Sequence, residues 1–428
     1  MRRATPRTWS ARSNSTPISG SSTATSSPSG STPGSRADPP MTRRWWPFAL
    51  VAPLLIFLIA SFIAPVMLML SRAVIDRDLE RAWPESAAAL RAWDGDGLPP
   101  DGLARTVAHE TLATHRAGTL NRVANRLNYD MVGSRSLLYA TADRLAAGAP
   151  GDTVADLARI DPRWGQPAIW SVMRHADGPL TSYYLLAALD RRLDAEGRIV
   201  GVPREQAVFG DIFLRTFKIS AVVALLCTLL GYPVAYLLAS LPARTANPLL
   251  ILVLLPFWTS ALVRTAAWAV LLQTNGVVNG ALQTIGLIDA PIQLIYNRLG
   301  VYIAMTHVLL PFFILPLYSV MKGIAPTAMR AASSLGASPM LAFRKVYLPQ
   351  TLPGVAAGAI IVFTLALGYY VTPALMGGGA DQMISASIAF YTNQSLNWGM
   401  AAALSLLLVL PLLLMLFAGR TMVRTVPA

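Results

Sequence analysis

Cysteine is nearly absent from this chain, in which Cys227 is the one cysteine among 428 residues. A single thiol cannot form a disulfide within the chain, and it cannot build a cysteine-based metal site. Charged residues are also scarce at 13%, whereas 54% of the residues are hydrophobic and the mean hydropathy is +0.47. Such a chain is far more apolar than a soluble domain, which places it in a lipid bilayer.

The dipeptide Gly-Lys occurs nowhere in the sequence. No Walker A loop is therefore present to hold nucleotide phosphates, and the chain is not itself an ATPase. Paired carboxylates and nucleophilic triads are missing from the apolar region, so nothing there argues for chemistry on a substrate. His109 and His115 beside Glu110 are six positions apart and do not share a helical face, unlike a zinc-protease pair. We expect no catalytic residue, no cofactor and no metal.

The formal net charge of +13 at first points to nucleic acid. The basic residues, however, fall in short clusters beside long apolar runs, as they do in the cytoplasmic loops of membrane proteins. We therefore expect a lipid bilayer and no nucleic acid as the partner of these charges.

Six segments have the length that a helix needs to cross the hydrocarbon core, about 20 mainly apolar residues. They contain no Asp or Glu, although a transporter driven by protons or sodium needs intramembrane carboxylates or broken-helix ion sites. We predict an all-α polytopic membrane protein with six transmembrane helices, and a secondary transporter remains the alternative. The segments are residues 46–70, 213–238, 248–272, 300–321, 354–376 and 398–418.

The orientation follows from the positive charges next to these segments. Loops rich in Lys and Arg stay in the cytoplasm. We predict that both termini are cytoplasmic in a bacterial inner membrane, although Arg215 and Lys218 run against the rule. The supporting residues are Arg43, Arg44, Arg244, Lys322, Arg330, Arg344, Lys345, Arg420 and Arg424.

Two stretches outside the membrane differ from each other in composition. Residues 1–40 are rich in Ser, Thr, Pro, Gly and Arg, which predicts disorder, and Met41 resembles a natural start of translation. Residues 76–211 place leucine and valine at helical spacing with charges between them. We predict a helical periplasmic insert there, acting either as a scaffold or as a docking surface.

The long loop at 322–353, between the fourth and fifth segments, carries the most informative motif. Its run from Met329 to Pro349 has two alanines, a glycine four positions after the second, and then Phe, Val, Leu and Pro at fixed offsets. This run resembles the EAA loop of ABC importer permeases, with Arg330 where that family usually has Glu. The matching residues are Arg330, Ala331, Ala332, Leu335, Gly336, Ala337, Phe343, Val346, Leu348 and Pro349.

The resemblance implies a transport subunit that works with other proteins. It implies cytoplasmic ATP-binding subunits that receive this loop as a short coupling helix, a second permease subunit in a heterodimer, and a periplasmic solute-binding protein. The residue types suit that role, because small side chains at Ala331, Ala332 and Gly336 permit close approach of another surface. Gly336 also permits the turn that ends a short helix.

Four further runs resemble permeases of the spermidine/putrescine class within a permease domain at 213–421. They are 231–236, 255–259, 310–312 and 368–373. The resemblance implies a polyamine or related cation as solute, for which a carboxylate and aromatic ring faces are suitable partners. Aromatic residues near a membrane interface also serve as lipid anchors. The expected substrate-path residues are Trp258, Arg264, Tyr369, Tyr370 and Asp381.

Overall fold

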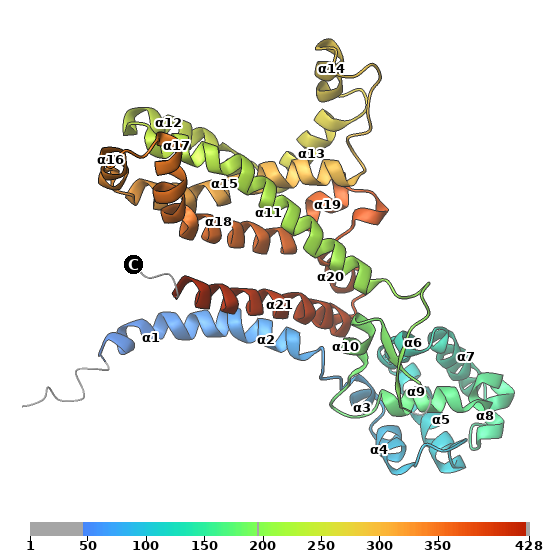
Figure 1. The fold of residues 1–428 in the computed structure, drawn as a ribbon. Coiled ribbons are helices and arrows are strands. Elements are labelled where there is room, and N and C mark those ends of the chain that lie inside the picture. The colour runs from blue at the N-terminus through green and yellow to red at the C-terminus, as the bar shows by residue number, and fades with distance from the viewer. Residues whose placement is uncertain (1–45, 195–196, 425–428) are drawn as a thin grey trace, which may run out of the picture. The chain divides into compact units, whose positions relative to one another are not determined.

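A computed structural model describes residues 46–194 and 197–424 of the chain (Figure 1). The chain divides into two units between Ile59 and Ala60, and α1 (Trp46–Leu58) belongs to the first. The tail predicted to be disordered, residues 1–40, and Met41 lie outside the described residues.

Five helices are long and apolar enough to cross a membrane, and a bent helix pair makes a sixth crossing if it counts as one span. This confirms the all-α polytopic fold predicted from the sequence. The five are Val51–Ser71, Phe209–Ser240, Arg298–Gly323, Pro339–Gly368 and Trp398–Phe417, and the bent pair is Ala243–Trp258 with Ala261–Thr284.

The insert after the first span is a helical domain with its own core. Trp83, Trp164 and Trp170 are fully buried at its centre. The indole N–H of Trp83 donates to Thr114 Oγ1 at 3.1 Å, and that of Trp164 donates to Thr141 Oγ1 at 2.8 Å. Burial of such large rings is favourable when the polar N–H keeps a partner. The helices are α3 (Asp78–Ala82), α4 (Pro84–Ala92), α5 (Asp101–Arg116), α6 (Asn121–Asp130), α7 (Ser134–Ala146), α8 (Val154–Ile160), a 3-10 turn (Pro162–Gly165), α9 (Pro167–His175) and α10 (Tyr183–Ala188).

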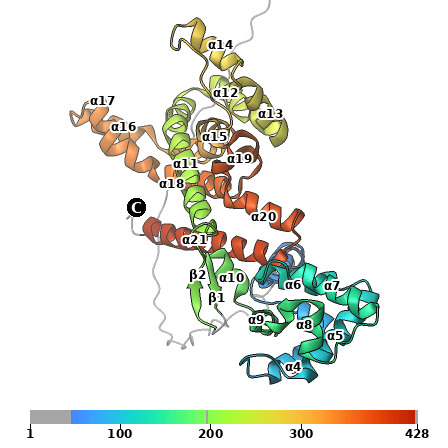
Figure 2. The ribbon, with the colours of Figure 1, turned by 90° about the vertical axis from the view of Figure 1, so that its right-hand side faces the viewer.

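The insert is joined to the last span through α10. Glycine at position 399 lets the backbone of α21 (Trp398–Arg424) approach the ring of Tyr184, because a Cβ there would lie 2.4 Å from ring carbons. Beside α10 lies the antiparallel hairpin of β1 (Arg191–Leu193) and β2 (Ile199–Gly201), as Figure 2 shows.

Three long helices pack against one another in the membrane region. Phe313 on the central helix is fully buried, and glycines on both neighbours make room for it. A Cβ at Gly231 would lie 2.5 Å from the Phe313 ring, and one at Gly358 would lie 2.9 Å from it. The glycines are therefore required by close packing. The three helices are α11 (Phe209–Ser240), α15 (Arg298–Gly323) and α18 (Leu348–Gly368).

The third predicted crossing, expected as one helix over 248–272, is broken in the structure. α12 (Ala243–Leu254) and a 3-10 turn (Leu255–Trp258) are followed by α13 (Ala261–Leu272), and the chain bends by 97° at the break. Ser260 is the cause, since its side chain accepts the backbone N–H of Val263 at 3.2 Å and starts a new helix. A further helix, α14 (Val277–Thr284), follows.

The fifth crossing, expected over 354–376 with Pro373 breaking the helix near its outer end, is interrupted before that proline. α18 ends at Gly368, and α19 (Val371–Met376) begins after a break. Pro373 has no N–H to donate to the carbonyl of Tyr369 four residues earlier. That carbonyl accepts the hydroxyl of Ser385 at 2.9 Å instead, which satisfies it outside the helix. A 3-10 turn (Gly379–Asp381) and α20 (Ile384–Asn393) lead on to α21.

Candidate functional site

The loop at 322–353 forms a short helix that the rest of the chain leaves uncovered. α16 (Pro326–Ser334) has no buried residue, and Leu335 after it is 89% exposed. α17 (Pro339–Ala342) and one π-helical turn (Phe343–Tyr347) return the chain to α18. An apolar side chain this exposed at a helix end is available to a partner.

Gly336 ends α16 in the left-handed conformation, with φ of +85°. Its N–H donates to the carbonyl of Ser333 at 3.0 Å, and the N–H of Ala337 donates to that of Ala332 at 3.1 Å. This is the Schellman arrangement, which favours glycine at the left-handed position. A Cβ at Gly336 would meet nothing within 4 Å, so only the backbone conformation requires glycine within this chain.

Aromatic rings attach the base of the loop to α11. The Phe343 ring lies edge-on to Tyr236 with centroids 5.7 Å apart, and it stacks on Tyr347 at the same distance. Tyr232 is a further edge-on neighbour at 6.3 Å, and its hydroxyl lies 3.2 Å from Thr351 Oγ1. Such ring pairs contribute about 0.5 to 1.5 kcal/mol each beyond area burial.

Tyr232 and Tyr236 were not among the site residues expected from the sequence. The signal lay in the run at 231–236, whose two tyrosines are four positions apart and therefore share one face of a helix. Phe343 is one of the residues that match the motif, and the structure supplies the rings that receive it. Val346 and Leu348 are half-buried beside it, whereas Pro349 is exposed.

The loop and the insert lie at opposite ends of α11 (Figure 1). The insert leads directly into Phe209, the first residue of α11. The loop reaches the other end, where Lys322 Nζ donates to the carbonyls of Ala239 and Leu241 at 3.5 and 3.4 Å. A lysine there also interacts favourably with the negative end of the helix dipole.

Asp381 is paired with a residue far away in the sequence. Its Oδ1 accepts Arg298 Nε at 2.9 Å, its Oδ2 accepts the N–H of Gly378 at 3.3 Å, and the residue is 7% exposed. Arg298 opens α15, and Asn297 caps that helix by accepting the N–H of Gly300 at 3.0 Å. The carboxylate is therefore committed to Arg298 rather than exposed to solvent.

The other expected substrate-path residues gather around the two helix breaks. Trp258, before the bend, is 79% exposed, and Tyr370, before α19, is 46% exposed. Arg264 on α13 is half-buried and its Nη2 donates to the carbonyl of Thr259 at 3.1 Å, while its Nε is buried without a partner. Tyr369 is half-buried at the second break.

Contacts join α13 to α19, so the two breaks belong to one region. The hydroxyls of Thr265 and Thr372 lie 3.0 Å apart, and both side chains are buried. Thr265 directly follows Arg264, and Thr372 comes two positions after Tyr370; Arg264 and Tyr370 are both expected path residues. Helix breaks in a membrane region are tolerated only against protein or a wet cavity.

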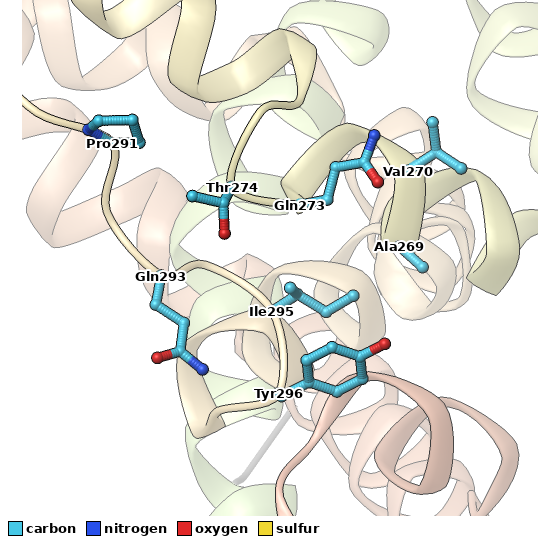
Figure 3. A pocket seen from close by; sticks show the side chains of 8 residues that line it. All are labelled: Ala269, Val270, Gln273, Thr274, Pro291, Gln293, Ile295 and Tyr296. Carbon is cyan, nitrogen blue, oxygen red and sulfur yellow. The ribbon is translucent and has the colours of Figure 1, made fainter.

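A cavity of about 560 Å³ opens beside α13 (Figure 3). Gln273, Thr274, Gln293 and Tyr296 supply amide and hydroxyl groups, and no charged residue lines it. Tyr296 has a φ of +58° and precedes Arg298, the partner of Asp381, by two residues. This cavity suits neutral hydrogen-bonding groups better than a cation.

Comparisons with known proteins agree with this architecture. Residues 228–425 match the family of binding-protein-dependent transport system inner membrane components. The spermidine/putrescine transport system permease protein PotB of Salmonella typhimurium strain LT2 is 33% identical over 212 residues, which cover 49% of this chain and 74% of that protein. PotB of Escherichia coli K12 is 32% identical over 212 residues, covering 49% of this chain and 77% of its own length.

A solved bacterial ABC transporter for import of the acidic polysaccharide alginate is 19% identical, with a TM-score of 0.41 over 51% of this chain and 80% of its own. The chain belongs to the family of binding-protein-dependent transport system inner membrane components. It is a multi-pass inner-membrane permease that resembles the polyamine permeases. The insert at 76–208 lies outside the residues that the family matches.

Proposed function

We propose that this permease forms the translocation path of an ATP-driven importer for a small polar solute, with a polyamine or related cation as the solute class. The importer also contains separate cytoplasmic ATP-binding subunits, a second permease in a heterodimer and a periplasmic solute-binding protein. The similarity to PotB of several bacteria supports the solute class.

The observation that carries the proposal is the form of the loop at 322–353. Its tip is uncovered, with Leu335 89% exposed, whereas its base is held on α11 by the rings of Phe343 and Tyr236. A loop with an uncovered tip and a closely packed base can transmit a rigid-body movement of a bound subunit to the membrane helices. The tip therefore binds the ATP-binding subunit. Arg330 on α16, where the family usually has Glu, gives that contact a positive charge.

The cytoplasmic position expected for the loop sets the orientation of the chain in this proposal. With the loop in the cytoplasm, the insert at the other end of α11 is periplasmic (Figure 1). The basic residues before the first span and after the sixth support cytoplasmic termini. The basic residues near the loop agree with this orientation. In the periplasm the insert is placed to contact the solute-binding protein.

The solute path runs past the helix breaks between α13 and α19. Trp258 and Tyr370 supply exposed ring faces, to which a cation is attracted. Asp381 acts on this path through Arg298, whose position at the start of α15 it fixes. The broad exposed apolar surface of the spans, including Leu262 at 62%, is available to lipid and to the second permease.

Reconstitution tests the proposal. The chain is inserted in liposomes with its ATP-binding subunits, second permease and binding protein, and uptake of labelled spermidine is measured with and without ATP. ATP-dependent uptake supports the proposal, and Leu335→Cys should cross-link to the ATP-binding subunit. Uptake that needs no ATP but collapses with a protonophore would instead establish the secondary transporter. ATP-dependent import of a different solute would support the importer but exclude a polyamine as its solute.

A further inference from the structure

Arginines crowd the junction between the first span and the insert. The first is Arg72, which directly follows the last residue of α2 (Ala64–Ser71). The others lie in the insert, at the residue before α3, on α3 and on α6. They are Arg77, Arg81, Arg122 and Arg126.

Two adjoining cavities lie among these residues. One of about 350 Å³ is lined by Arg72, Arg81, Arg122 and Arg126 together with two asparagines. A second of about 500 Å³ shares part of this lining, including Arg72, and continues to Leu68 at the membrane end. The shared residues connect the two cavities into one groove.

The guanidinium groups in this groove differ in how they are engaged. Arg72, Arg81 and Arg122 are exposed, and within the described part of the chain their side chains make no hydrogen bond or salt bridge, although Asp78 interacts electrostatically with Arg72 and Arg81. Arg126 is 1% exposed and donates to Asp76 and, from Nη1 at 2.7 Å, to Asp130. Its Nη2 is buried and has no partner among the described atoms.

The groove lies where the first span ends and the sixth begins. Leu68 and Met69 line it and belong to the last two turns of the first span, which ends at Ser71. Trp398 lines it from the first residue of the sixth span and is 48% exposed. Tryptophan is enriched at the depth of the lipid headgroups. A ligand in this groove therefore meets apolar span residues on one side and free arginines on the other.

We propose that this groove binds a phosphate group, and that the phosphate is that of a phospholipid headgroup. Arg72, Arg81 and Arg122 donate to its oxygens, because guanidinium forks match phosphate geometry. The acyl chains lie along Leu68 and Met69 in the bilayer. Asp78 also lines the groove and accepts hydrogen bonds from the hydroxyl or ammonium groups beyond the phosphate. The bound lipid fastens α3 and α6 to the end of the first span.

Lipid binding to the full chain tests this proposal. The chain is purified in detergent, freed of lipid and titrated with phosphatidylglycerol, and bound lipid is counted by native mass spectrometry. The test variant is the double substitution Arg81→Gln and Arg122→Gln. The matched control is Arg116→Gln with Arg135→Gln, which removes two exposed insert arginines that form no ion pair with any described residue and lie outside the groove.

We expect the test variant to bind phosphatidylglycerol about tenfold or more weakly and the control to bind like the unaltered chain. Arg81→Lys with Arg122→Lys should retain most of the affinity. Circular dichroism verifies that each variant is folded. A test variant that is folded and binds lipid as tightly as the control would overturn the proposal.

A parallel titration with inorganic phosphate separates the two sources of the ligand. Suppose that phosphate binds, that its binding depends on Arg81 and Arg122, and that phosphatidylglycerol does not bind. The groove would then be a phosphate site, and the proposal that its ligand is a lipid would be wrong. Phosphate that only competes weakly with bound lipid would support the headgroup.

Discussion

The ring of Phe343 in the loop lies edge-on to the ring of Tyr236 on α11, with centroids 5.7 Å apart and planes at 85°. Tyr347 meets the same tyrosine at 5.4 Å and 84°. A displacement of the loop is therefore passed to α11 through packed rings, because close-packed groups cannot move independently.

Phe343→Ala should uncouple the loop from α11. Removing the ring deletes its pairs with Tyr236, Tyr232 and Tyr347, each worth about 0.5 to 1.5 kcal/mol. We expect uptake to fall by about tenfold while the amount of protein in the membrane stays unchanged. Transport assays and immunoblots measure both quantities. Phe343→Tyr keeps the ring and should transport normally; equal activity in the alanine and tyrosine variants would contradict the role of the rings.

Two matched cysteines test the orientation. Val132 in the insert is 90% exposed and Leu335 in the loop is 89% exposed, whereas the native Cys227 is fully buried. In cells with a permeable outer membrane, a membrane-impermeant maleimide should label Val132→Cys and leave Leu335→Cys unlabelled. Both should react after the inner membrane is opened. The reverse labelling pattern would invert the orientation.

Asp381→Asn should weaken uptake of a cationic solute, because it leaves Arg298 without the carboxylate that holds it. The Asp381 side chain is largely buried but that of Arg298 is 50% exposed, so the single variant leaves an unpaired guanidinium group whose position is no longer fixed. The double variant with Arg298→Gln should therefore recover part of the lost uptake. A double variant as impaired as the single one would show that the Asp381 carboxylate itself meets the solute.

Arg126→Met should destabilise the insert by about 3 to 5 kcal/mol, because Asp76 and Asp130 would remain buried without their cation. Burial raises the pKa of Asp130 above its ordinary value, and Arg126 opposes that rise. Without Arg126 the pKa rises further. A carboxyl with a raised folded pKa stabilises the protein as pH falls through that value toward the ordinary carboxyl pKa, so the variant should regain stability between about pH 7 and about pH 4. Melting temperatures measured at both values would show it; a deficit that is the same at both would exclude protonation of Asp130.

Local and long-range features differ in how far the sequence predicted them. The spans follow from runs of apolar residues, and the end of α16 follows from Gly336, because both depend on neighbouring positions. The pairing of Asp381 with Arg298 joins residues 83 positions apart. No local pattern specifies such a contact, since it depends on how α15 and the segment after α19 are packed.

The helix breaks lie between these two cases. Pro373 gave a local signal, but the break comes at Tyr369 because the effect of a proline falls on the carbonyl four residues earlier. At the third span, hydropathy alone favoured one helix over 248–272. The capping hydroxyl of Ser260 was decisive and is invisible to hydropathy.

Gly336→Asp should abolish coupling because it disturbs the contact with the ATP-binding subunit, not because it disturbs the fold of this chain. At φ of +85° a side chain costs about 1 to 2 kcal/mol in backbone strain, and no described atom lies close enough to a Cβ there to clash with it. Against an ATP-binding subunit the same side chain overpacks a close contact and adds an unpaired charge. We expect normal abundance, uptake reduced by about tenfold or more, and ATPase activity that no longer responds to loaded binding protein.

The insert offers a matched control for this substitution. Gly118 follows α5 with φ of +69° and open space around it, and its N–H and that of Thr119 donate to His115 and Thr114 in the same Schellman arrangement. Gly118→Asp therefore imposes similar strain at a helix end that receives no ATP-binding subunit, and it should transport normally. If both variants lose transport equally, backbone strain is the cause. If Gly336→Asp transports like Gly118→Asp, the loop does not couple the ATPase to the membrane helices.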